Sequence, residues 1–570
     1  MKRLTLVFSI LFAMGLLLSA CIAAGPEIAA ETDSEEAAAE SPEPEEGLWY
    51  NPDHVGETWI NICTDAPPTY GGVATDIFFG WGESNPTWWG TGFPMFYSFS
   101  QLYDVLGDGV TLEPDAAESW EVSADGLTYT FNLRNDVKFH DGELLTADHA
   151  KYSFEVHAHP EVGAWNAGWM PYRAFSGGPE FLDGSADEIS GIVAVDDFTL
   201  QISVLEPQMH LEYLIATINL MPAHLMQDIP FGELKDSELV GQPIGTGPFK
   251  FVEHVPGEYT SFEAFEDYYG GRPYLDRAIY RIGVTGSTAT WIAALEKGEI
   301  QTGYLASGLD RVRLEEDPNV VLIAGPTAGG MYLNMNTERV EHKVRQALMF
   351  AIDKEAIAEG IWLGHAEAFD LRDNDPAGEW VSPDITIYNY DPDKAKTLLE
   401  EAGWDPEREL SLITYYQGDL DRRVLAALQD QWGQVGIKVE VNVLDTPAFI
   451  ERSREAGDYD IGYACCGGPA APYEYTRDSC DKSPYPNWSR NCNEEMDTLV
   501  LSGIAEPDPE KRRDLFYQAT EIATESAYQV ALFRPDRRYA ISKDLCNYTY
   551  REYLLVFSDQ HPDRWYLRSE

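Results

Sequence analysis

The stretch Glu121–Leu133, EVSADGLTYTFNL, joins two strand-like runs through the pair Asp125-Gly126. Asp-Gly between alternating residues is a strong signal for a tight β-hairpin, because glycine adopts the positive φ that such turns need. The apolar residues of the second run alternate with polar ones and therefore share one side of the strand; they are Leu127, Tyr129, Phe131 and Leu133. The stretch predicts a hairpin with one buried face.

The residues on either side extend this pattern. Residues 135–141 (NDVKFHD) predict a further strand, and Thr146-Ala147-Asp148 is typical of a helix start. Residues 191–204 (GIVAVDDFTLQISV) predict a second hairpin around Asp196-Asp197. From Trp49 to about Ile282 the chain is therefore expected to alternate short strands and turns.

From about Gly286 the sequence changes to alternating helices and strands. Asp391-Pro392 supplies a helix N-cap with proline at the first helical position, and Gly403 ends that helix. Three further apolar patterns predict two helices and a strand; they are Val344, Ala347, Leu348, Ala351 and Ile352, then Val424, Leu425, Leu428 and Trp432, then Ile437, Val439, Val441 and Val443. This repetition indicates an α/β lobe.

The first residues have the features of an export signal. Lys2 and Arg3 precede the apolar run Leu4–Leu18, which is shorter than the roughly 20 residues of a membrane span. The following Leu-Ser-Ala-Cys resembles a bacterial lipobox, which implies cleavage before Cys21 and acylation of that residue. Residues 21–48 are rich in Ala, Glu, Pro and Ser and predict a disordered acidic tether.

Composition excludes several classes of partner. The 570 residues contain 96 acidic and 40 basic side chains, a net charge of −56, and no Lys or Arg occurs between Arg3 and Arg134. Such a surface repels nucleic acids and anionic lipids, so polyanionic partners are not expected. The 44% apolar content is ample for packed cores, and no Walker A phosphate-binding loop is present.

Several short motifs suggest chemistry but have simpler explanations. Gly245-Thr246-Gly247-Pro248 lacks the lysine of a phosphate loop and is interpreted as a structural turn. His140-Asp141-Gly142 has ordinary turn chemistry, and no G-x-S-x-G nucleophile motif accompanies it. His157 and His159 do not share a helical face, so they do not predict a metal site.

Cys21 apart, the chain has six cysteines, an even number that favours disulfides outside the cytoplasm. Their fifteen pairings are not distinguished by spacing alone. A zinc site formed by Cys465, Cys466, Cys480 and Cys492 is the alternative, although adjacent cysteines are awkward zinc ligands.

Several blocks, in order, resemble one family, the extracytoplasmic solute-binding proteins of the dipeptide/oligopeptide/nickel class of ABC importers (solute-binding protein family 5). The blocks are 117–155, 243–282, 343–364, 390–404 and 487–499. The resemblance implies an α/β, two-lobed periplasmic-binding-protein-like fold of type II, in its large cluster with an extra subdomain, and a hinge between lobes.

The resemblance also implies a division of the chain. Its parts are a lipoprotein signal peptide (1–20), the tether (21–48), lobe one with the extra subdomain (49–283), lobe two (284–530) and a C-terminal return to lobe one (531–570). In similar dipeptide-binding proteins a disulfide closes the loop that corresponds to 480–492, which implies a Cys480–Cys492 bond. The four remaining cysteines can then form disulfides in three ways, one of which joins Cys465 to Cys466 and Cys63 to Cys546.

The loop after the strand that ends near Tyr463 carries the ligand prediction. Peptide binders of this family place an aspartate there that pairs with the free amine of the peptide, whereas residues 464–471 contain no acid. Since a buried ammonium without a carboxylate is costly, either another acid, such as Glu474 or Asp478, replaces it or the ligand has no free amine there. Nearby aromatic residues suit sugar rings as well as peptides; in lobe one these include Trp165 and Trp169.

The sequence therefore predicts a lipid-anchored, extracytoplasmic, monomeric solute-binding protein without catalysis, cofactor or metal. Its partners are a peptide, or alternatively an oligosaccharide or other neutral polar solute, and a membrane permease with a cytoplasmic ATPase. A secreted hydrolase, with Cys465 or two acids as catalytic groups, is the alternative of another class. The candidate ligand-binding residues are Tyr463, Cys465, Cys466, Gly467, Tyr473, Tyr475, Trp488 and Asn334 in lobe two, and Trp88 and Trp89 in lobe one.

Overall fold

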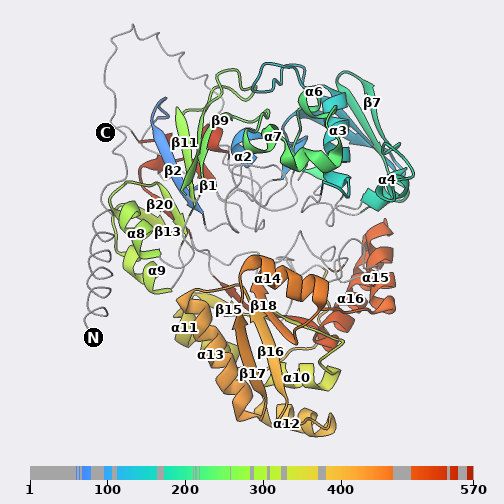
Figure 1. Cartoon of the computed structure of the whole chain (residues 1–570), viewed down its shortest axis with the longest axis vertical. Helices are drawn as coiled ribbons and strands as arrows, with labels where there is room; N and C mark the ends of the chain where they lie inside the picture. The colour runs from blue at the N-terminus through green and yellow to red at the C-terminus, as the bar shows by residue number, and fades with distance from the viewer. Residues whose placement is uncertain are drawn as a thin grey trace, which may run out of the picture. The chain divides into compact units, whose positions relative to one another are not determined.

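The structure is a computed structural model, shown in Figure 1. It describes residues 59–60, 63, 67–78, 95–105, 112–162, 172–208, 211, 215–216, 218–256, 258–282, 288–304, 308–322, 330–369, 380–465, 475, 480, 489–535, 539–549 and 561–568. All of these residues belong to one compact unit, Gly56–Glu570. None of the helices in this part of the chain is long and apolar enough to cross a membrane.

One four-stranded sheet joins distant parts of the first half of the chain. Strand β2 (Val73–Phe78) pairs in parallel with β11 (Arg277–Ile282), and β10 (Tyr259–Ala264) pairs antiparallel with both β11 and β9 (Phe249–Val255). Helix α2 (Met95–Ser98) lies against β9. Its Tyr97 ring stacks on Phe262, with ring centroids 5.1 Å apart, in a core that also contains Trp565.

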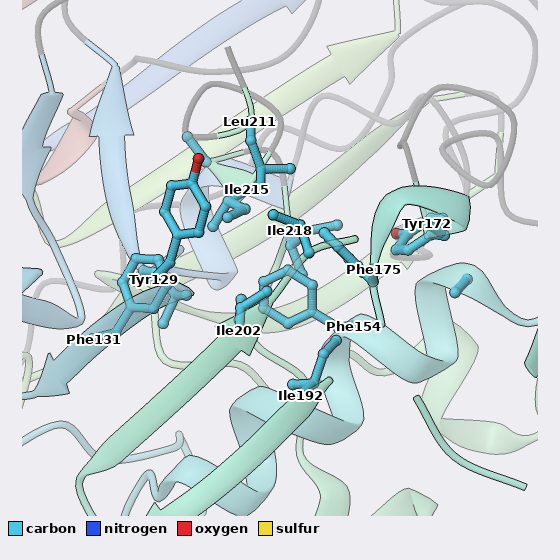
Figure 2. Close-up of a cluster of buried hydrophobic side chains, with 14 of the residues drawn as sticks. Tyr129, Phe131, Phe154, Tyr172, Phe175, Ile192, Ile202, Leu211, Ile215 and Ile218 are labelled. Atoms are coloured by element: carbon cyan, nitrogen blue, oxygen red, sulfur yellow. The ribbon is translucent and has the colours of Figure 1, made fainter. Parts of the chain in front are cut away.

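The two predicted hairpins are confirmed and form a second sheet in the order β5-β6-β8-β7. The first consists of β5 (Ala117–Val122) and β6 (Thr128–Leu133), with Gly126 at φ +71° in the turn; the second consists of β7 (Ile192–Asp196) and β8 (Thr199–Ser203). Helix α3 (Ala147–Ala158) begins directly after Thr146, as predicted, and packs against this sheet. Figure 2 shows Phe154 of α3 among Ile192, Ile202 and Ile218.

The predicted strand at residues 135–141 is wrong. Only Lys138 makes a β-bridge, to Leu144, because the chain reverses at once through Asp141-Gly142. The backbone N–H of His140 donates instead to Gly245 O, at 2.8 Å. The backbone groups of residues 135–141 therefore bond to separate partners and do not form the continuous hydrogen-bond ladder of a strand.

A small sheet brings the end of the chain back to β2. Strand β20 (Tyr539–Ser542) pairs with β12 (Thr302–Tyr304) and β13 (Val320–Leu322), beside α8 (Thr288–Glu296) and α9 (Gly308–Glu315). The Gln301 Oε1 atom accepts a hydrogen bond from Thr75 N, at 2.7 Å. A disulfide joins Cys63 to Cys546, with a Cα–Cα distance of 5.4 Å.

A six-stranded mixed sheet dominates the second half of the described chain. Its order is β15 (Ala366–Ala368), β19 (Gln529–Pro535), β14 (Met331–Met335), β18 (Ile461–Cys465), β16 (Glu409–Thr414) and β17 (Lys438–Val443). The predicted helices are α10 (His342–Phe350), α12 (Pro392–Glu401), which begins after Asp391, and α13 (Asp419–Gln434). The first ends earlier than its apolar pattern suggests, since Asp353 caps a separate helix, α11 (Lys354–Trp362).

The remaining elements are short or connect these sheets. They are β1 (Trp59–Ile60), β3 (Tyr103–Val105), β4 (Leu112–Pro114), η2 (Tyr172–Ala174), α4 (Gly178–Leu182), α6 (Ala223–Met226), η3 (Phe231–Asp236), α7 (Glu238–Gly241), α14 (Thr446–Ile450), η4 (Glu451–Ala456), α15 (Glu494–Ala505), α16 (Pro509–Ser526), β21 (Leu545–Cys546), β22 (Tyr548–Thr549), η6 (Pro562–Arg564) and β23 (Tyr566–Leu567).

The chain passes twice between the small β12–β20–β13 sheet and the six-stranded sheet. The first passage is from β13 to β14, and the second is from β19 to β20. The lobe boundaries predicted at 283/284 and 530/531 stay predictions.

Removing the Cys63–Cys546 bond in a C63S/C546S variant should lower the free energy of unfolding by about 2–5 kcal/mol, because the bond restricts the unfolded chain. Urea unfolding without reductant measures the loss. A C480S/C492S variant is the matched control; it opens a loop with a sequence separation of 12 rather than 483 and should lose less. Equal stability of wild type and C63S/C546S contradicts the prediction.

The fully buried His157 should make the protein less stable in acid. Burial lowers the pKa of this ring to about 4, although its Nδ1 bonds to Ser153 O at 2.6 Å. Above the unfolded pKa of about 6.5 both states are neutral, whereas at pH 5 only the unfolded chain binds the proton, which costs about 2 kcal/mol of stability between pH 7 and 5. Burial also raises the pKa of Glu155 to about 7, which acts in the opposite direction.

The comparison therefore uses a variant that does not titrate. H157N keeps an N–H donor near Ser153 O and should show a free energy of unfolding that falls less than that of wild type between pH 7 and 5. Y390F is the control, since Tyr390 is 44% exposed, and it should follow wild type. Parallel pH profiles for H157N and wild type would exclude this contribution.

Candidate functional site

The ends of four strands meet at one edge of the six-stranded sheet. Strand β16 runs parallel to β17 and β18, and β14 is antiparallel to both β18 and β19. The carboxyl ends of β16, β17, β18 and β19 therefore lie at the same edge, together with the start of β14. Ligands of open α/β sheets bind outside the carboxyl ends of the strands, so we call this the carboxyl edge.

The structure places some of the predicted ligand-binding residues on this sheet. Tyr463 and Cys465 belong to β18, and Asn334 belongs to β14. Cys465 pairs with Met331 at the carboxyl edge, and Asn334 pairs with Gly462 further into the sheet. Tyr475 is buried in a different cluster, which contains residues of α15 and α16. Cys466, Gly467, Tyr473, Trp488, Trp88, Trp89 and Cys21 lie outside the described residues.

Tyr463 is fully buried and forms a hydrogen bond to a buried acid. Its side chain belongs to the apolar core of the sheet, and its hydroxyl donates to Asp421 Oδ1, at 3.2 Å. Asp421 lies in the first turn of α13, where the positive end of the helix dipole favours a carboxylate. The proposed substitutes for the missing loop acid, Glu474 and Asp478, are outside the described residues, whereas Asp421 is an acid that the structure places near the carboxyl edge.

Two tyrosines at this edge were not predicted from the sequence. Tyr415 and Tyr416 follow β16 directly; both are half-buried, and their ring centroids are 4.5 Å apart. Tyr416 meets Tyr463 edge to face at 6.1 Å, and Tyr415 meets Phe449 of α14 at 4.9 Å. The signal that could have identified them is an aromatic pair between a strand and the Gly-Asp start of a helix.

A disulfide fixes the far end of the segment that follows β18. Cys480 is bonded to Cys492, with Cα atoms 4.6 Å apart. The Cys480 backbone N–H donates to Asp497 Oδ2 of α15, at 2.7 Å. Cys480 is therefore fixed both to Cys492 and to α15.

The turn at residues 245–248 is structural, as predicted. A Cβ on Gly245 would lie 1.9 Å from Ser98 O, and a Cβ on Gly247 would lie 2.6 Å from Phe99 N, so only glycine fits against this backbone. The Nε2 atom of His140 bonds to Gly247 O at 3.0 Å, and burial lowers the pKa of this ring to about 4. Its turn neighbour Asp141 accepts from His224, at 2.8 Å.

The other histidines considered also have packing roles. His157 is buried inside α3, and the His159 ring stacks on Phe231 with centroids 4.2 Å apart. Within the described ranges, no group of three or more His, Cys, Asp or Glu side chains is arranged to hold a metal ion.

With this geometry established, comparison with known proteins identifies the family. The model of "Bacterial extracellular solute-binding proteins, family 5 Middle" matches residues 111–482. The chain belongs to this family. Since family members bind solutes and are not enzymes, the predictions of the family and of a solute-binding role without catalysis are confirmed.

Two relatives and one solved structure illustrate the similarity. A Brucella ovis protein that carries the name of an ABC transporter peptide-binding protein is 30% identical over 496 residues, which cover 84% of this chain and 88% of that protein. The dipeptide-binding protein of Escherichia coli is 29% identical over 437 residues, 73% of this chain and 79% of the relative.

The solved structure is that of the oligopeptide-binding protein of Bacillus subtilis in complex with a nonapeptide. It superposes with a TM-score of 0.73 at 22% identity and covers 88% of this chain and 100% of that chain. This similarity confirms the predicted two-lobed fold of the family 5 proteins.

Replacing Tyr463 with phenylalanine should destabilise the family 5 protein by about 1–3 kcal/mol, because the buried Asp421 carboxylate loses a hydrogen-bond donor while the ring volume is retained. Thermal or urea unfolding measures the change. Y390F is the control, since Tyr390 is 44% exposed, and it should leave stability unchanged. If Y463F is as stable as Y390F, the Tyr463–Asp421 bond does not contribute to stability.

Proposed function

We propose that this protein captures peptides outside the cytoplasm and delivers them to the permease of an ABC importer. Support comes from membership of family 5 and from relatives named as peptide-binding and dipeptide-binding proteins. The observation that carries the proposal is the carboxyl edge, where strand ends and half-buried tyrosines converge as at the ligand edges of other α/β proteins.

The chemistry of this edge suits a peptide. Tyr415 and Tyr416 offer ring faces for apolar side chains, together with hydroxyl groups that donate and accept hydrogen bonds. Asp421, with Tyr463 as its donor, supplies negative charge near the edge.

The lobes are proposed to close over the ligand about the hinge between them. Ligand then shifts an equilibrium between open and closed forms by its differential affinity for the two. We further propose that the mature protein is a monomer held at the membrane by acylated Cys21, with residues 21–48 as the tether. In this arrangement the permease and its ATPase, and not this chain, drive transport.

An oligosaccharide or other neutral polar solute is the second candidate. The specific observation in its favour is that residues 464–471 contain no acid to pair with a peptide amine. Stacked tyrosine rings suit the apolar faces of sugars as well as peptide side chains.

Native mass spectrometry of the gently purified, lipid-free protein tests the proposal. We expect peptides of a few residues to co-purify with the protein, one peptide per chain, and to stay unhydrolysed. Co-purifying glycans in place of peptides would establish the second candidate, and turnover of added peptide would contradict a binding role.

The variant Y416A should weaken binding of a co-purified peptide roughly tenfold, or about 1.4 kcal/mol, as truncation of an aromatic contact commonly does. Isothermal titration measures the affinity. Y390A is the matched control and should bind like wild type, because Tyr390 lies just before α12 and away from the carboxyl edge. Unchanged affinity of Y416A would exclude the tyrosine pair from the ligand site.

A further inference from the structure

The two faces of β14 differ in chemistry. Met331, Leu333 and Met335 belong to the apolar core of the six-stranded sheet, so Asn334 projects from the opposite face. Asn334 lies directly opposite Gln529 of β19 on one side and Gly462 of β18 on the other. Since side chains of directly opposed residues stand about 5 Å apart at Cβ, the Asn334 and Gln529 amides are neighbours.

Both amides carry an unsatisfied oxygen. The Asn334 side chain is buried, at 2% exposure, and neither its Oδ1 nor Gln529 Oε1 has a hydrogen-bond partner among the described residues. An unpaired buried acceptor costs about 1–3 kcal/mol, and native proteins rarely retain one. Two adjacent acceptors of this kind indicate that a donor occupies the place between them.

On the side of Asn334 away from Gln529, the neighbouring strand presents no side chain. Gly462 has no side chain beside Asn334, and a Cβ there would lie 3.6 Å from Asn334 Cβ and 3.7 Å from the Tyr459 ring. Asn336 fixes the Tyr459 backbone, because its Nδ2 donates to Tyr459 O at 3.1 Å. Asn334 is therefore closely packed on the β18 side, and a donor shared with Gln529 would lie on the β19 side.

We propose that Asn334 and Gln529 form an acceptor pair for a hydrogen-bond donor group. The donor is the terminal N–H group of a long polar side chain of the captured peptide, or a water molecule that fills the same place. We call these two origins of the donor the peptide source and the water source. The peptide source rests on the proposed function, whereas the water source does not.

The position of the pair selects among peptide side chains. Asn334 lies three residues from Met331 at the carboxyl edge, which is about 10 Å at roughly 3.3 Å per residue. A ligand held at the edge reaches this depth only with the longest donor side chains, those of lysine and arginine. The net charge of −56 also favours these cationic side chains.

Paired peptides test the peptide source. Alanine pentapeptides that carry one lysine or one norleucine, placed at each position in turn, are titrated against the full mature chain by calorimetry. At one position, wild type should bind the lysine peptide at least tenfold more tightly than its norleucine partner. N334L, which removes the acceptor at similar volume, should abolish this ratio, and N334D, which has only acceptors, should increase it.

The control N442L changes an asparagine on the same sheet face that is already hydrogen-bonded to Ser411. It should keep the wild-type ratio, and thermal unfolding of every variant verifies folding. A lysine-to-norleucine ratio that N334L leaves unchanged overturns the peptide source.

A high-resolution crystal structure tests the water source. A water within hydrogen-bond distance of both Asn334 Oδ1 and Gln529 Oε1 supports the acceptor pair even where no peptide discriminates. If neither a water nor a ligand donor lies there, the proposal is overturned. Wild-type protein that binds no peptide at all counts against the proposed function, while the crystallographic result still decides the acceptor pair.

Discussion

The pairing of β14 with β18 and β19 is the interaction on which the candidate site depends. β14 runs antiparallel to its two neighbours, so its first residue lies near their carboxyl ends, and Met331 lies opposite both Cys465 and Phe533. A slip of one residue would exchange the faces of β14, bury Asn334 in the core and expel Leu333. The same register therefore determines the apolar core, the carboxyl edge and the polar face.

The opposite edge of this sheet contains a charged network that maintains the register. Asp460, just before β18, accepts from Ser411 N at 2.8 Å and from Arg339 Nε at 3.1 Å, and Arg408 approaches it at 3.4 Å. Asp460 is 3% exposed, so removal of these donors would leave a buried charge unpaired. The arginine–aspartate network thus lies at one end of the strands, and the tyrosine rings lie at the other.

Local patterns in the sequence were sufficient to predict the hairpins and helices. Asp125-Gly126, Thr146 and Asp391-Pro392 each determine their own turn or cap, and the structure confirms all three. The strand predicted at residues 135–141 failed because the chain reverses through Asp141-Gly142, and because the backbone partner of His140, Gly245, is about a hundred residues away.

The site was less predictable for the same reason. Tyr463 was identified through its strand, but its partner Asp421 and the neighbouring Tyr415 and Tyr416 come from other segments, and only the sheet order brings them together. The two amides of Asn334 and Gln529 are likewise almost two hundred residues apart in sequence. The candidates Cys466, Gly467, Tyr473, Trp488, Trp88 and Trp89 stay predictions.

The bond between Cys63 and Cys546 also bears on how the protein is made. Because β20 and β22 pair with strands near the beginning and middle of the chain, the half of the molecule that begins first is completed last. A ribosome must synthesise the chain through Cys546 before this bond forms, by which time the six-stranded sheet has all of its strands. The order of synthesis thus favours a folding sequence in which the inserted half matures before the half that surrounds it.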